Sequence, residues 1–256
     1  MFEKLKLISL SVNHISFKES LEQVTELSLK KIPSYVCFAN VHMVIEAYND
    51  KSILSQVNNA DLVLPDGKPI AMSCNILHRK RQERISGMDF TPLLLEKADE
   101  NKLSIFVYGS TDNVIKAFKE KINSNYPAIH FAGAISPPFR SLADDEIKDD
   151  IEMINRSGAN IVLVSLGCPK EGKWMSKTSD KINAVLIGIG GALPIVAGVQ
   201  KRAPRWMQNM SLEWLYRLIQ QPGRLFTRYL YTNSYFLFLL SRDYIKSLFK
   251  DNVSQP

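Results

Sequence analysis

Residues 160–190 read NIVLVSLGCPKEGKWMSKTSDKINAVLIGIG, in which two continuous apolar runs enclose a polar segment. The runs, 160–167 and 183–190, are rich in Val, Ile and Leu, which is the composition of strands buried on both faces. Strands of this kind that alternate with helix-length segments indicate a mostly parallel sheet. The stretch therefore predicts two parallel strands joined through a helix.

The same alternation extends back to the N-terminus. The other predicted strands are 5–12, 34–39, 61–64, 103–109 and 128–133. Amphipathic segments such as 17–31 and 141–157, with apolar residues three and four positions apart, separate them. Residues 1–198 are therefore predicted to form an α/β domain, in which helices cover both faces of a mostly parallel sheet.

The last fifth of the chain differs in charge and in aromatic content. The whole chain has a net charge of +6, but residues 199–250 hold nine basic residues and only two acids, Glu213 and Asp243, so this stretch alone carries +7. It also holds 11 of the 24 aromatic residues. The contrast predicts a basic and aromatic helical appendage, residues 199–256, joined to the first domain.

Cysteine and histidine spacing argues against structural disulfides and zinc sites. Cys37, Cys74 and Cys168 form no Cys-x-x-Cys pair, and the four histidines form no His-Glu-x-x-His motif, so a reducing cytoplasm is the expected compartment. The apolar stretches are far shorter than the ~20 residues of a membrane span, and the N-terminal segment reads as a strand rather than a signal peptide. An integral membrane protein is therefore not expected.

Polar residues follow the predicted strands, at the edge where parallel sheets bind ligands. Asp66 lies in a Pro-Asp-Gly turn, where a carboxylate can act as the general base of glycosyl transfer. Alternatively, Asp66 caps the following helix and Gly67 supplies the turn. Asn40 follows strand 34–39 and either binds a sugar or caps its helix, and spacing alone favours the cap.

Three glycine-bearing loops, 109–111, 167–170 and 188–191, lead into predicted helices. Unpaired N–H groups at a helix start bind phosphate, although each loop also fits a plain turn, and none is a Walker A loop. Lys170 is a candidate to neutralise a diphosphate, or else an ordinary surface lysine. The acidic segment 144–150 has no Asp-x-Asp spacing and predicts a solvated helix face rather than a metal site.

The basic tail combines apolar helical stripes with arginines. One stripe in 212–219 ends near Pro222-Gly223, and a second begins at Leu225. Basic residues beside Trp, Tyr and Leu suit an anionic membrane surface. The same composition suits RNA, and a third alternative is an ordinary helical subdomain packed on the core.

Seven motifs follow one another in a specific order. They are Asp66-Gly67 after Ala60-Asp61-x-Val63, Arg84-x-x-Gly87-x-Asp89, Gly167-x-Pro169-Lys170, Gly188-x-Gly190, Lys201-Arg202-Ala203-Pro204-x-Trp206-Met207, Leu212-Glu213-Trp214-Leu215-x-Arg217-Leu218 and Pro222-x-Arg224-Leu225-x-x-Arg228-Tyr229. In this order they resemble the WecG/TagA/CpsF family of bacterial glycosyltransferases, and the resemblance covers nearly the whole chain.

The resemblance implies a Rossmann-like fold and an inverting transfer that needs neither a metal nor a cofactor. The implied donor is a UDP-sugar, of the N-acetylmannosamine, N-acetylmannosaminuronic acid or glucuronic acid class. The acceptor would be a polyprenyl-diphosphate-linked glycan in cell-surface polysaccharide synthesis. The protein would then be cytoplasmic and peripheral on the inner face of the bacterial membrane, with an anionic membrane surface and a second copy of the chain as candidate partners and no nucleic acid.

The resemblance also assigns roles to the residues singled out above. It implies Asp66 as the base, Asn40 as a sugar-site residue and Arg84 near the reacting groups. The residues expected to hold UDP are Gly109, Ser110, Gly167, Pro169, Lys170, Glu171, Gly188, Gly190 and Gly191. Those expected to face the lipid diphosphate are Arg217, Arg224 and Arg228.

The chain departs from the family pattern at Phe38, Glu171 and Leu193-Pro194. Many members have Thr at the first of these positions, and the second is a Gln in the family. An acid beside a diphosphate is unfavourable unless Lys170, Lys173 or an arginine offsets its charge. The departures motivate one alternative, a non-catalytic membrane-bound scaffold of a polysaccharide assembly complex, and the composition of the tail motivates another, an RNA-binding module.

Overall fold

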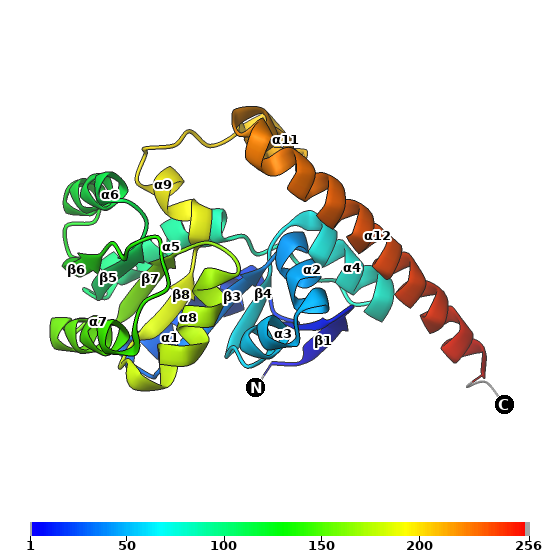
Figure 1. Ribbon diagram of the computed structural model, residues 1–256, viewed down its shortest axis with the longest axis horizontal. Coiled ribbons are helices and arrows are strands. Elements are labelled where there is room, and N and C mark those ends of the chain that lie inside the picture. Colours follow the sequence, from blue (N-terminus) through cyan, green and yellow to red (C-terminus); the bar gives the residue numbers. More distant parts are fainter. Residues whose placement is uncertain (1, 254–256) are drawn as a thin grey trace.

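A six-stranded parallel sheet forms the centre of the protein, which the computed structural model describes over residues 2–253 (Figure 1). The strands are β3 (Ser34–Ala39), β4 (Leu62–Pro65), β5 (Ser104–Gly109), β6 (His130–Ile135), β7 (Ile161–Ser165) and β8 (Val185–Gly188). Their spatial order is β4-β3-β8-β7-β5-β6, and every neighbouring pair is parallel. The predicted parallel sheet is confirmed.

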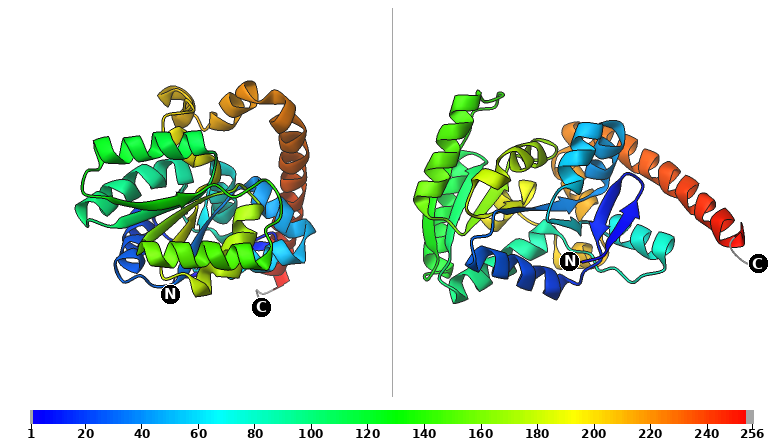
Figure 2. Two further views of the ribbon diagram at one scale, coloured as in Figure 1. Left: turned by 60° about the vertical axis from the view of Figure 1, so that its left-hand side comes forward. Right: turned by 90° about the horizontal axis from the view of Figure 1, so that it is seen from below.

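Helices cover both sides of this sheet (Figure 2). One side carries α2 (Val41–Asn49), α3 (Lys51–Asn58), α4 (Lys68–His78), α7 (Asp144–Ser157) and α8 (Lys170–Thr178). The other side carries α1 (Phe17–Leu29), α5 (Gly87–Glu100), α6 (Asp112–Asn125) and α9 (Leu193–Val196). Alternate residues of each strand face the two helical layers: in β7, Val162 and Val164 face one and Ile161 and Leu163 the other. Because a strand such as β7 is buried on both faces, its sequence is apolar at consecutive positions.

The N-terminal segment departs from its prediction as one strand, 5–12. It forms an antiparallel hairpin of β1 (Lys4–Leu7) and β2 (Leu10–Asn13), which is a separate two-stranded sheet. Ile8 turns the chain with a φ of 55°. The single-strand prediction is wrong. Apolar residues recur at every second position on both sides of the turn, so the two strands of the hairpin resemble one strand in the sequence. Asn13 ties the hairpin to β4, since its Oδ1 accepts the N–H of Val63 at 2.7 Å.

The remaining predicted elements occur with shifted ends. Predicted strand 128–133 begins two residues later, as β6, and the predicted helices 17–31 and 141–157 appear as α1 and α7. Two short 3₁₀ helices, η1 (Ser179–Lys181) and η2 (Gly190–Ala192), flank β8. The second of these forms the turn by which β8 enters α9.

The C-terminal region consists of α10 (Arg205–Asn209), α11 (Glu213–Gln220) and α12 (Pro222–Val253). α12 packs against α2 and α4 and buries Phe236 and Leu239 in the core, while its C-terminal end extends away from the sheet (Figures 1 and 2). α12 begins at Pro222, three residues before Leu225, where the sequence predicts the second apolar stripe to begin. The division into 1–198 and 199–256 stays a prediction, and residues 254–256 lie outside the described residues. No helix within 2–253 combines the length and apolarity that crossing a membrane requires.

Candidate active site

The carboxyl ends of β4, β3, β8 and β7 lie side by side at one edge of the sheet. The loops at Asp66, Asn40, 188–191 and 167–170 therefore meet there, as predicted from the parallel topology. The end of β5 lies four strand positions from β4, roughly 19 Å away at about 4.8 Å per strand. The loop at 109–111 is thus remote from Asp66.

Asp66 is half-buried directly after β4, and its backbone N–H donates to the carbonyl of Ala39 at 2.9 Å. The helix-capping alternative is wrong, because Gly67, with a φ of 96°, is the N-cap of α4 and no side chain caps that helix. Burial raises the pKa of Asp66 to about 7, although the charges of Arg84 and Arg217 act to lower it. A carboxyl group with this pKa is suited to accept a proton near neutral pH.

Asn40 caps α2. Its side-chain oxygen accepts the N–H of Met43 at 3.1 Å, so the capping interpretation is confirmed. A contact between Asn40 and a sugar stays a prediction. His42, in the first turn of the same helix, was not singled out by the sequence. It is half-buried, and burial together with the charge of Arg228 lowers its pKa, so its imidazole is neutral near pH 7.

Glu171 lies between two of the glycine loops. Its side chain is buried, its Oε2 accepts the N–H of Gly167 at 3.2 Å, and the backbone of Gly190 also hydrogen-bonds to this carboxylate. Burial raises its pKa to about 7, the backbone hydrogen bonds lower it and the charge of Asp66 raises it further. Backbone N–H groups, rather than the exposed Lys170, therefore stabilise this acid.

Gly188, Gly190 and Gly191, at and just after the end of β8, lie close to side chains of other elements. A Cβ at Gly188 would lie 2.7 Å from Cε of Met175, and a Cβ at Gly190 would lie 3.2 Å from Oε2 of Glu171. A Cβ at Gly191 would lie 2.9 Å from Nη2 of Arg217, so this guanidinium group lies directly against the loop. An arginine of the basic tail thus reaches the same edge as Asp66.

The remaining loop residues have structural roles of their own. Gly109 has a φ of 102°, and a Cβ there would lie 2.6 Å from the carbonyl oxygen of Ser165. The N–H of Ser110 donates to the same oxygen at 2.9 Å. This plain turn accounts for both residues, and their contact with a nucleotide stays a prediction. Gly167 has a φ of 77° and Pro169 is the N-cap of α8.

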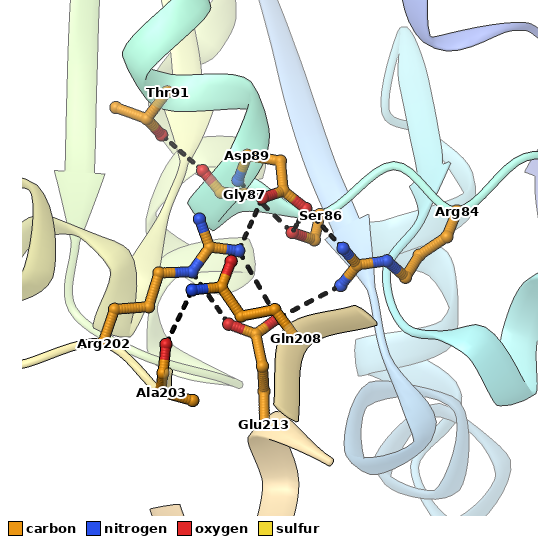
Figure 3. Close-up of polar contacts among 9 residues, drawn as sticks. All are labelled: Arg84, Ser86, Gly87, Asp89, Thr91, Arg202, Ala203, Gln208 and Glu213. Atoms are coloured by element: carbon orange, nitrogen blue, oxygen red, sulfur yellow. Dashed lines mark hydrogen bonds and ion pairs between the residues drawn. The ribbon is translucent and has the colours of Figure 1, made fainter. Parts of the chain in front are cut away.

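Four charged side chains link the tail to the start of α5 (Figure 3). Arg84 donates to Asp89 and, at 3.3 Å, to Glu213. Arg202 donates to the same two acids, with a distance of 2.8 Å from its Nε to Oε1 of Glu213. Ser86 caps α5 and also donates to Asp89. We call Arg84, Asp89, Arg202 and Glu213 the charge cluster.

The charge cluster brings together residues more than a hundred positions apart, and no local pattern in the sequence connects them. Glu213 is buried although it lies in the basic tail. The sequence offers one sign that Glu213 is unusual, since it is one of only two acids in residues 199–250, whose net charge is +7. Because Glu213 contacts both arginines, the cluster fixes α11, and with it Arg217, over the carboxyl edge of the sheet.

Arg228 and Arg224, the other two tail arginines predicted to face the lipid diphosphate, lie in different environments. Arg228 is half-buried, and its charge influences His42 and Cys168, so it faces the same edge. Arg224 is exposed at the start of α12. A role for each at a lipid diphosphate stays a prediction.

Two of the departures from the family pattern lie in the core. Phe38 is buried and packs edge-on against Phe90, with 5.4 Å between ring centroids. Leu193 is buried and Pro194 occupies the first turn of α9. Both departures are therefore accommodated by packing.

An open pocket of about 420 Å³ lies beside Arg84, and its size is typical of a small-molecule site. Its lining residues are Lys68, Ala71, Met72, Asn75, Gln82, Arg84, Gln208, Asn209 and Ser211. α4 connects it to the edge, since Lys68 follows Asp66 by two positions. Within residues 2–253 no three His, Cys, Asp or Glu side chains are grouped to hold a metal ion, and metal independence stays a prediction.

Comparisons with known proteins give the family of this chain. Residues 5–249 match the model of the Glycosyl transferase WecG/TagA/CpsF family. A Bacillus subtilis (strain 168) protein is 32% identical over 235 residues, which cover 88% of each chain. A Bacillus spizizenii protein is 31% identical over 195 residues, covering 75% of this chain and 73% of its own. A Staphylococcus aureus (strain MW2) protein is 26% identical over 192 residues, covering 75% and 74%.

All three relatives are named N-acetylglucosaminyldiphosphoundecaprenol N-acetyl-beta-D-mannosaminyltransferase. The family match spans almost the entire described chain, including the tail that carries Glu213 and Arg217. The chain therefore belongs to the WecG/TagA/CpsF family of glycosyltransferases.

Proposed function

We propose that this glycosyltransferase moves N-acetylmannosamine from UDP to a polyprenyl-diphosphate-linked N-acetylglucosamine acceptor, with inversion at the anomeric carbon. The relatives' names give the sugar and the acceptor. The observation that carries the proposal is Asp66, a half-buried acid with a pKa of about 7 whose surroundings include two arginines.

In the proposed reaction Asp66 takes the proton of an acceptor hydroxyl. The oxygen attacks the anomeric carbon from the face opposite UDP, the bond to the diphosphate breaks, and UDP leaves with the bonding electron pair. Arg217, held against Gly191, supplies positive charge for the departing diphosphate. The pocket beside Arg84 is the proposed position of the acceptor sugar, with Lys68 near its phosphates.

The proposed site of action is the surface of an anionic membrane, and α12 supports it because its two sides are both apolar. The side that packs on the protein contains Leu225, Thr232, Phe236 and Leu239. The exposed side contains Phe226, Leu230, Tyr231, Leu237, Phe238, Tyr244, Ile245, Leu248 and Phe249. At about 100° per residue these sets lie on opposite sides of the helix. Such a helix can lie in a bilayer interface while its other side stays on the protein.

The positions of the basic side chains fit the same surface. Arg224 and Arg242 lie at one border of the exposed apolar side at about 100° per residue, where lipid phosphates would meet them. Neighbouring helices add exposed apolar side chains at Trp206, Met210 and Trp214. Together these residues make the exposed surface of the C-terminal region rich in aromatic and basic groups.

The test is UDP release from UDP-N-acetylmannosamine with a lipid-linked N-acetylglucosamine acceptor. Asp66→Asn is expected to lower kcat by at least about a hundredfold while leaving UDP binding largely intact. Asp112→Asn, at an exposed position in α6, is the matched control and is expected to behave like the wild type. Normal turnover by Asp66→Asn would refute the base assignment. Absence of turnover by the wild type with this donor and acceptor, despite vesicle binding, would favour the scaffold alternative.

A further inference from the structure

The carboxylate of Glu171 occupies the N–H groups that a diphosphate would use. Gly167 and Gly190 each lie two residues after the end of one of the neighbouring strands β7 and β8, and the backbones of both hydrogen-bond to this one side chain. Only 6% of Glu171 is exposed, so the carboxylate is enclosed by the loops. Backbone N–H groups arranged in this way bind anions, and here the anion belongs to the protein itself.

Among the side chains that the structure describes, no lysine, arginine or histidine forms an ion pair with Glu171. Asp66 at the end of β4 repels it, and the thiols of Cys37 and Cys168 are neutral because burial and the charge of Glu171 raise their pKa. Arg217 lies against Gly191, one residue beyond Gly190. Glu171 therefore depends on backbone N–H groups, and a second anion at these groups would meet its charge.

We propose that Glu171 is a positioning residue for the donor. In the free protein its carboxylate holds the loops at Gly167 and Gly190 together. When the donor diphosphate binds, Glu171 becomes a neutral acid and releases the N–H groups of both loops to the diphosphate. This inference rests on the proposed function, because it assumes a nucleotide-sugar donor at the carboxyl edge. It adds that donor binding takes up one proton at Glu171.

The sign of the pH dependence follows from the charge. In the free protein the pKa of Glu171 is about 7, so the acid is mostly neutral at pH 6 and mostly ionised at pH 8. A bound diphosphate favours the neutral form and raises this pKa further. Donor affinity is then expected to be about tenfold weaker at pH 8 than at pH 6, since one proton must be taken up at the higher pH.

The experiment is isothermal titration calorimetry of the full chain with UDP-N-acetylmannosamine, in buffers of different ionisation enthalpy at pH 6, 7 and 8. The diphosphate of a UDP-sugar is a diester and does not titrate in this range, so the buffer dependence counts protons taken up by the protein. For the wild type we expect about half a proton at pH 7 and nearly one at pH 8. Glu171→Gln removes this titrating group and is expected to lose most of the proton uptake and most of the pH dependence of the dissociation constant.

Three further variants make the assignment specific. Asp66→Asn is expected to retain the uptake, and Glu152→Gln, at an exposed position in α7, is the matched control and should also retain it. Glu171→Ala provides a second removal of the carboxylate in case Gln disturbs the loops, and it too should lose most of the proton uptake.

The results separate this inference from the proposed function. Uptake that persists in Glu171→Gln and Glu171→Ala but disappears in Asp66→Asn would place the proton on Asp66 and overturn the inference while leaving the glycosyltransferase intact. Donor binding by the wild type without proton uptake would also overturn it. A wild type that binds no UDP-N-acetylmannosamine at any pH would overturn the proposed donor, and the inference with it.

Discussion

Nη1 of Arg84, in the loop before α5, lies 3.3 Å from Oε2 of Glu213 in α11, although 129 positions separate the two residues. Glu213 also accepts from Arg202, so one buried acid joins the sheet domain to the tail. This contact also determines where a second residue of the tail lies. α11 also carries Arg217, which lies against Gly191 at the edge where Asp66 is found.

Replacement of Glu213 by Ala is expected to destabilise the protein, because two partly buried guanidinium groups lose a shared acceptor. Since both arginines keep some contact with water and with Asp89, we expect a loss of about 2 kcal/mol in the free energy of unfolding. Transfer activity should fall as well, because Arg217 is no longer held in place. Chemical denaturation and UDP release measure the two effects.

Asp243→Ala is the control for this variant, since Asp243 is the other acid of the basic stretch and contacts the neighbouring Arg242 near the surface. It is expected to change the free energy of unfolding by less than about 0.5 kcal/mol. Equal effects of the two replacements would show that the charge cluster has no special role.

The rate of transfer is expected to rise with pH through about 7. Asp66 must be ionised to accept a proton, and burial raises its pKa to about 7, so its active form is scarce at pH 6 and predominant at pH 8. With donor and acceptor saturating, kcat reports the pKa of Asp66 in the complex, where the negative diphosphate keeps this pKa at or above its value in the free protein, so kcat should increase at least about tenfold between pH 6 and pH 8. Measurement of kcat at saturation separates this effect from the opposite change expected in donor affinity. A kcat that is constant across this range would contradict the role of Asp66.

Gly109 is expected to be far more sensitive to replacement than Gly172. Gly109→Ala places a Cβ 2.6 Å from the carbonyl oxygen of Ser165 at a φ of 102°, which requires β5 and β7 to separate. We expect a loss of about 3 kcal/mol in the free energy of unfolding. Gly172→Ala meets no atom within 4 Å in helix α8 and should stabilise the protein by about 0.5 kcal/mol. Thermal melting of both variants tests the contrast.

The exposed side of α12 is expected to provide most of the membrane affinity. The double variant Leu237→Ser/Phe238→Ser removes two side chains that are 61% and 63% exposed, which should weaken binding to anionic vesicles by roughly a hundredfold without lowering the melting temperature. Phe139→Ser, at a 90% exposed position before α7, is the matched control and should bind as the wild type does. Vesicle sedimentation measures the binding. Unchanged sedimentation together with loss of a dimer in size-exclusion chromatography would assign this surface to a second copy of the chain.

The sequence was sufficient for the parallel sheet because burial on both faces leaves a local signal. Runs such as 160–167 are apolar throughout, and the segments between them have helical periodicity. The N-terminal hairpin had no such signal. Its alternation resumes after a shift of one position between Leu7 and Ile8, which also fits an irregular single strand, and the reversal occurs at the positive φ of Ile8. Local pattern therefore predicted the strands but not where one of them turned back.

For the candidate site, the position of Asp66 and Asn40 followed from a general rule, since the carboxyl ends of parallel strands share one edge. The sequence could not show that Glu171 turns inward to the backbones of Gly167 and Gly190, because that direction is decided by how α8 packs. Nor could it pair Arg202 with Asp89, since these residues meet only once the tail has folded back over the sheet. Contacts of this kind depend on tertiary structure alone.

β4 is the outermost strand on its side of the sheet, and the strand that carries Asp66 would therefore expose unpaired main-chain groups. Strands in that position tend to recruit a strand from another molecule and aggregate. Here the amide oxygen of Asn13 caps the Val63 N–H, and the hairpin lies alongside. The proposed base thus lies at a border that a bulky lipid-linked substrate could approach from the side, while the backbone at that border is closed to β-type self-association.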